Sequence, residues 1–84
     1  MSVAQVSQVS RTVERTIMGL KTQSITTAVA MADLQKTQAL LLNQGRVQEA
    51  QEVTIAMQAI QSGNTGHAEK TLMGTIVHLD QGKV

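Results

Sequence analysis

Apolar residues recur at helical spacing from residue 12 onward. The first run is Val13, Ile17, Leu20, Ala28, Met31, Ala32 and Ala39, at intervals close to three and four. This pattern predicts a first helix from Thr12 to Asn43, roughly 47 Å long, with Ser10 or Thr12 as its N-cap. Gly19 and several Ser and Thr residues weaken its middle. A kink or break near residues 21–27 therefore stays open.

Two shorter helices follow, each bounded by glycine. Gly45 comes directly after an apolar stretch and predicts a left-handed C-terminal cap. The second helix then carries the stripe Val47, Ala50, Val53, Met57 and Ile60. Gly63 ends it, Thr65 is the candidate N-cap of the third helix, and Gly82 closes that helix. The third stripe is Ala68, Leu72, Ile76 and Leu79.

These elements predict an all-α fold. It is a three-helix bundle with one long first helix and two shorter antiparallel helices. The period-three valines before Arg11 fit neither a strand nor a long helix face, so residues 1–11 are expected to form a flexible tail or linker. Residues 12–84 would then form a single helical domain.

Unmatched helix length leads to an interaction hypothesis. Two helices of about 16 residues span only ~24 Å and cover about half of the first helix. Its apolar N-terminal stripe would remain exposed and form an interaction surface: Val13, Ile17, Leu20 and Ile25. Ala50 and Ala68 stand at equivalent places after Gly45 and Gly63, so both are expected at tight helix crossings.

Composition limits which residues can form the core and sets the charge of the surface. The 84 residues contain no aromatic residue and five Met, so the core must be aliphatic, with Met filling gaps in it. An adaptable methionine binding face is the alternative. Seven Lys and Arg against six Asp and Glu give a net charge of +1, too balanced for a nucleic-acid surface. No apolar run approaches the ~20 residues that span a bilayer, and no signal peptide is visible. We therefore expect a soluble, cytoplasmic chain without membrane insertion.

The sequence offers little catalytic chemistry. Without Cys there is no thiol nucleophile or thiolate metal site. His67 and His78 are eleven residues apart, about three helical turns, so one metal ion cannot bridge them. No nucleophile or phosphate-loop motif occurs, and Ser and Thr are expected at helix caps and exposed positions. We predict neither an enzyme nor a cofactor or metal site.

Gly19 and Gly74 are unusual inside helices, and close helix contacts would explain both.

Two segments, Leu41–Ala50 and Lys70–Lys83, resemble the C-terminal helical region of bacterial proteins that carry a von Willebrand factor type A domain. The similarity covers about residues 13–83 and implies a helical module whose first helix continues from a preceding domain. The metal site of that family is an Asp-x-Ser-x-Ser motif in a separate α/β domain. This chain lacks the motif, so no metal-binding residue carries over.

Pattern and resemblance together predict a non-enzymatic accessory or protein-interaction module. Its partner would be another protein or the preceding domain of the same chain. The alternative is a self-associating helical adaptor that forms a homo-oligomer.

Overall fold

The computed structural model describes residues 3–81, with side chains from Gln8 onward. Those residues contain four α-helices and no strand: α1 (Val3–Lys21), α2 (Thr27–Asn43), α3 (Val47–Gln61) and α4 (Thr65–Gln81). The all-α prediction is confirmed. The three-helix bundle is wrong, because the predicted long first helix is two helices. The two later helices were found near their predicted bounds, as α3 and α4.

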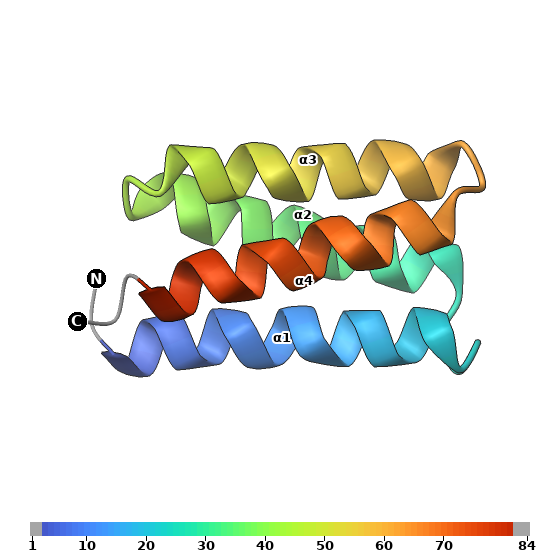
Figure 1. Cartoon of the computed structure of the whole chain (residues 1–84), viewed down its shortest axis with the longest axis horizontal. Helices are drawn as coiled ribbons and strands as arrows, with labels where there is room; N and C mark the ends of the chain where they lie inside the picture. Colours follow the sequence, from blue (N-terminus) through green and yellow to red (C-terminus); the bar gives the residue numbers. More distant parts are fainter. Residues whose placement is uncertain (1–2, 82–84) are drawn as a thin grey trace.

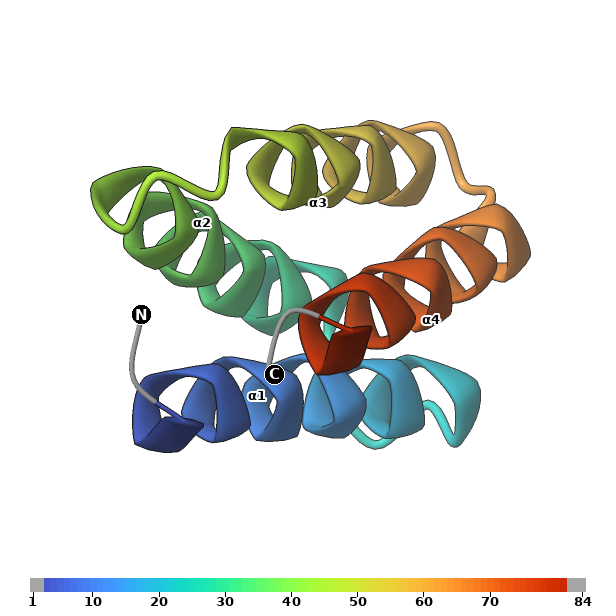
Figure 2. The ribbon, with the colours of Figure 1, turned by 60° about the vertical axis from the view of Figure 1, so that its left-hand side comes forward.

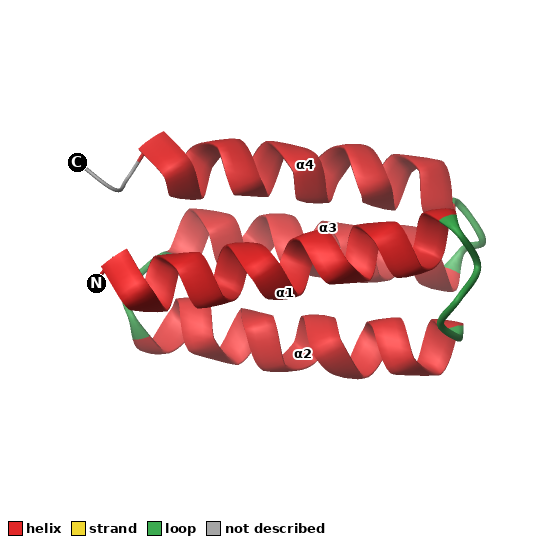
Figure 3. Ribbon diagram, turned by 90° about the horizontal axis from the view of Figure 1, so that it is seen from below, coloured by secondary structure: helices red, strands yellow, loops and turns green. Residues whose placement is uncertain are grey.

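The helices form an up-and-down bundle of 34 × 20 × 18 Å. α1 packs against α2 and α4, and α3 packs against the same two helices. Figure 2 shows the four helices around one centre, and Figure 3 shows that their connections alternate between the two ends of the bundle. The start of α1 and the end of α4 therefore lie at the same end (Figure 1).

The break between α1 and α2 has a local cause. Gln23 adopts a left-handed backbone conformation with φ 58°, which stops α1. Thr26 then caps α2, because its side-chain hydroxyl accepts a hydrogen bond from the Val29 N–H. The chain reverses over five residues, and α2 packs back along α1.

All three connections use the same hydrogen-bond pattern. The residue with positive φ donates to the carbonyl three positions back, and the next residue donates to the carbonyl five positions back, at 2.8 to 3.3 Å. This is the Schellman motif, which satisfies the last carbonyls of a helix. Its left-handed residues are Gln23, Gly45 and Gly63. The predicted left-handed cap at Gly45 is confirmed, whereas Gly82 lies outside the described residues.

Two predicted N-terminal boundaries need correction. Residues 3–11 belong to α1 rather than to a tail, and Val9 is buried. Val9, Val13 and Ile17 are spaced by four, so they continue one helix face that the period-three start concealed. The cap of α4 is Asn64 rather than Thr65, because the Asn64 Oδ1 accepts from the His67 N–H at 3.2 Å.

The core is aliphatic and includes three threonines. Leu34, Leu41, Leu72 and Leu79 are among its fully buried side chains. Thr16, Thr37 and Thr75 are buried as well, and each hydroxyl donates to the carbonyl four residues earlier at 2.9 to 3.1 Å. This local bond removes the cost of burying an unpaired hydroxyl. The expectation that Ser and Thr stay at caps and exposed positions is therefore wrong for these three residues and for Ser10, a predicted N-cap that is buried within α1.

Candidate interaction surface

A polar network joins the start of α3 to the end of α4. Arg46 directly follows Gly45, and its Nη2 donates to Glu49 Oε1 at 3.0 Å and to the His78 carbonyl at 3.4 Å. Both charged side chains are mostly buried. The guanidinium thus satisfies a carbonyl near the C-terminal end of α4, where a positive charge is favourable.

Glu52 extends this network one turn further along α3. Its Oε1 accepts from Thr75 Oγ1 at 2.9 Å, and its Oε2 lies 2.8 Å from His78 Nδ1. Thr75 is fully buried and His78 is partly exposed. One carboxylate therefore contacts two side chains of α4.

A histidine beside a carboxylate also occurs in catalytic sites, where the histidine activates a hydroxyl. Here the arrangement differs. The Thr75 hydroxyl has one proton and two acceptors within hydrogen-bond distance, Glu52 Oε1 and the Thr71 carbonyl, and the described contacts include no bond from it to His78. Thr75 is fully buried, so a substrate cannot reach its hydroxyl, and the geometry is that of a structural link between α3 and α4.

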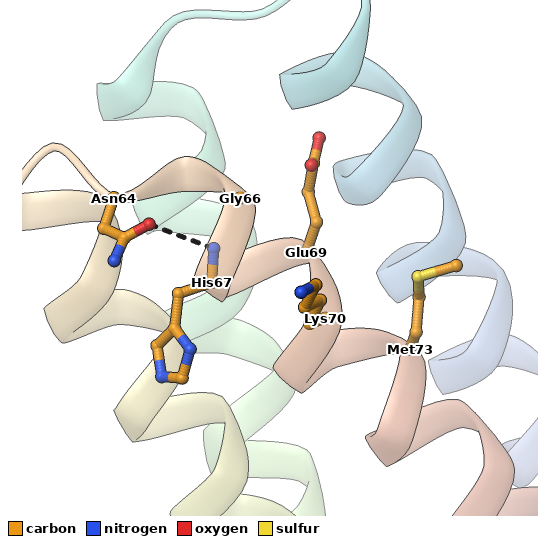
Figure 4. Close-up of a pocket in the computed structure, with 6 residues that line it drawn as sticks. All are labelled: Asn64, Gly66, His67, Glu69, Lys70 and Met73. Atoms are coloured by element: carbon orange, nitrogen blue, oxygen red, sulfur yellow. Dashed lines mark hydrogen bonds between the residues drawn. The ribbon is translucent and has the colours of Figure 1, made fainter.

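The beginning of α4 borders a pocket of about 480 Å³. It is lined by Asn64, Gly66, His67, Glu69, Lys70 and Met73 (Figure 4). The imidazole of His67 and the carboxylate of Glu69 point in opposite directions. The Asn64 side chain is already used in capping the helix. Polar groups that do not converge cannot surround a small ligand, and no group of three or more metal-ligating side chains was found within residues 3–81.

A second hollow, of about 300 Å³, lies between α1 and α4 and is mainly apolar. We call it the methionine groove and define it by its lining: Glu14, Ile17, Met18, Met73 and Ile76. Met18 and Met73 are 57% and 56% exposed, whereas Ile17 is buried and Ile76 is half-buried. Two flexible thioethers therefore line a groove that also includes buried and half-buried isoleucines.

A further exposed apolar residue lies on α4. Val77 is 52% exposed and stands four residues after Met73, on the same side of the helix. Figure 4 shows the Met73 side chain extending from α4 toward α1. Met18, Met73 and Val77 are thus three exposed apolar side chains of α1 and α4, two of which line the groove.

The predicted interaction stripe is not exposed. Val13 and Ile17 belong to the hydrophobic core, and Leu20 and Ile25 pack against it. The hypothesis depended on a long first helix whose N-terminal half had no neighbour. Because the chain turns at Gln23, α2 and α4 both pack on α1, and its apolar face becomes interior.

The other predicted positions fall in the interior or in turns. Ala50 and Ala68 are buried, as tight helix crossings require. A Cβ on Gly19 would lie 2.7 Å from two atoms of Ile25, so close approach explains this glycine. A Cβ on Gly74 would meet nothing within 4 Å, so close contact does not explain that one.

The expectation for methionine is confirmed in the core and fails at the groove. Met57 is buried and Met31 packs against the core, whereas Met18 and Met73 are exposed; Met1 lies outside the described residues.

A repeated segment in the sequence distinguishes the exposed pair. Residues 14–19 read Glu-Arg-Thr-Ile-Met-Gly, and residues 69–74 read Glu-Lys-Thr-Leu-Met-Gly. In each copy Met stands three residues after a basic residue and four after Glu, which places it on a charged helix face.

No known family model, curated protein or solved structure matches this chain. Within residues 3–81, none of the helices combines the length and the apolar character needed to cross a membrane. The fold and its surface define the class as an all-α four-helix bundle with an apolar groove between α1 and α4.

Proposed function

We propose that this chain is a non-enzymatic protein-interaction module and that the methionine groove is its docking surface. The main support for this proposal is that Met18 and Met73 stay more than half exposed, although the chain has a buried core available. Unbranched thioethers repack easily and are frequent on surfaces that bind apolar helices. The proposed occupant is an amphipathic helix of a partner protein, lying along the groove.

A hydrolytic alternative gains no support from the Thr75 hydroxyl that donates to Glu52, because Thr75 is fully buried and out of reach of a substrate. Glu52 of α3 contacts both Thr75 and His78 of α4 and so links the two helices. The polar groups at the start of α4 diverge. The groove, by contrast, offers apolar area without an internal partner.

Selection of helical peptides from a random library, followed by mapping on the folded chain, tests the proposal. Isotope-labelled methionine methyl groups report the site directly, because the groove and the core each contain methionine. Binding should shift the Met18 and Met73 signals and leave the Met57 signal, from a residue 8% exposed, nearly unchanged. Binders that act mainly elsewhere would contradict the groove.

Charge substitution supplies the matched control. Met18→Glu with Met73→Glu should abolish peptide binding while the helical content stays. Ile55→Glu changes an apolar residue of α3 that is 46% exposed, so it should bind like the unmodified chain. Equal loss of binding in both variants would argue against a specific groove. A groove occupied at high concentration by a second copy of the chain would support the self-associating adaptor instead.

The proposal includes a longer parent, as the resemblance to proteins with a von Willebrand factor type A domain implies. The test is to read the coding sequence upstream of the first codon. An α/β domain with an Asp-x-Ser-x-Ser motif there would support the relation, and its absence would oppose it.

A further inference from the structure

The methionines differ sharply in their access to solvent. Met18 and Met73 are 57% and 56% exposed, whereas Met57 is 8% exposed. Met31 is half-buried against the core. The two exposed residues line one groove although 55 positions separate them in the sequence, since α1 and α4 each carry one copy of the repeated segment.

We infer that Met18 and Met73 form a paired oxidation site for peroxides. The sulfur lone pair attacks one peroxide oxygen, the O–O bond breaks, and the sulfur becomes a sulfoxide. With hydrogen peroxide the other oxygen leaves as water. The sulfur loses two electrons and the peroxide gains two. The reaction requires an oxidant to approach the sulfur, so exposed methionines react before buried ones. The chain has no Cys, so no thiol competes for the oxidant.

Oxidation of this pair changes the surface and spares the core. A sulfoxide is a polar hydrogen-bond acceptor, so two of them make the most exposed part of the groove polar. The buried core residues Ile17 and Met57 keep their packing. The bundle should therefore stay folded while the groove loses its affinity for an apolar helix. A methionine sulfoxide reductase would reverse the change.

The selectivity follows from exposure alone, whereas the effect on binding rests on the proposed function. The selective oxidation and the loss of peptide binding can therefore fail separately. If Met18 and Met73 oxidise first but no peptide binds either form, the oxidation site stands and the docking role falls.

The experiment treats the full chain with hydrogen peroxide and follows each methionine by peptide mass mapping. Met18 and Met73 should gain oxygen several-fold faster than Met57 in the folded chain. In urea all three should react at similar rates. Circular dichroism melting should change little once Met18 and Met73 have both been oxidised.

A variant with Met18→Leu and Met73→Leu keeps the apolar shape and removes both sulfurs. Whatever affinity this variant has for the selected peptides should be the same before and after peroxide treatment, whereas the same treatment should inactivate the unmodified chain. Oxidation of Met57 at the rate of Met18 in the folded chain would overturn the inference. So would unfolding of the unmodified chain before the groove pair is oxidised.

Discussion

Gln23 is the weakest of the three helix-ending positions, and replacing it with glycine should stabilise the bundle. It occupies the place that Gly45 and Gly63 occupy in the other two connections. At φ 58° a side chain with a Cβ is strained, whereas glycine is not. The Gln23 side chain is exposed and makes no hydrogen bond within the described chain, so its removal should cost little.

The expected change in the free energy of unfolding is the difference between two opposing effects. A left-handed conformation costs a residue with a Cβ about 1–2 kcal/mol. Glycine loses more freedom on folding, which offsets about 0.5–1 kcal/mol of that gain. The expected net stabilisation by Gln23→Gly is about 0.5–1 kcal/mol. For a domain of this size, that corresponds to a rise in Tm of roughly 2–8 °C.

Urea unfolding followed by far-ultraviolet circular dichroism measures this effect, since the chain has no aromatic reporter. Gln23→Gly should raise the midpoint without altering the slope. Gln23→Ala removes the side chain but keeps the strain, so its midpoint should stay near that of the unmodified chain. Gly45→Ala adds strain without a steric clash, because a Cβ at that residue would meet nothing within 4 Å, and should lower the midpoint. Equal stabilisation by Gly and Ala at residue 23 would refute the backbone explanation.

Two further sets of substitutions test the packing. Gly74→Ala should stabilise the bundle by about 0.8–1.0 kcal/mol, because it is a helix-interior change into open space. Gly19→Ala should destabilise it by about 1–3 kcal/mol, because Ile25 must move. Thermal melting temperatures that shift in the same direction for both variants would contradict this. Ala50→Leu and Ala68→Leu should each cost about 1–3 kcal/mol by overpacking buried positions, and unchanged urea midpoints would show that the crossings lie elsewhere.

The sequence predicted helices where periodicity and glycine agreed. α3 and α4 have regular stripes and are bounded by Gly45 and Gly63, so their existence and antiparallel connection followed directly. The break between α1 and α2 was only an open alternative. Its left-handed residue is Gln23, which carries no sequence signal for that conformation, because few residues other than glycine adopt it.

The interaction surface was missed for a related reason. Once the first helix was predicted as continuous, the stripe through Val13 and Ile17 had no predicted neighbour and became the candidate surface. The turn at Gln23 brings α2 onto that stripe and buries it. The surface that remains contains Met18, which the expectation of a methionine-filled core did not identify as exposed.

The repeated segment separates what local sequence determines from what tertiary packing adds. Thr16 and Thr71 occupy the same place in the two copies, and each hydroxyl bonds the carbonyl four residues earlier, at 3.0 and 2.9 Å. That bond is local, so it recurs. The glycine that ends each copy has the same helix propensity but different surroundings: only Gly19 faces Ile25, from the turn that ends α1. If opposite signs are measured for alanine at the two glycines, that difference must come from packing, since the preceding residues and the helical backbone are nearly the same.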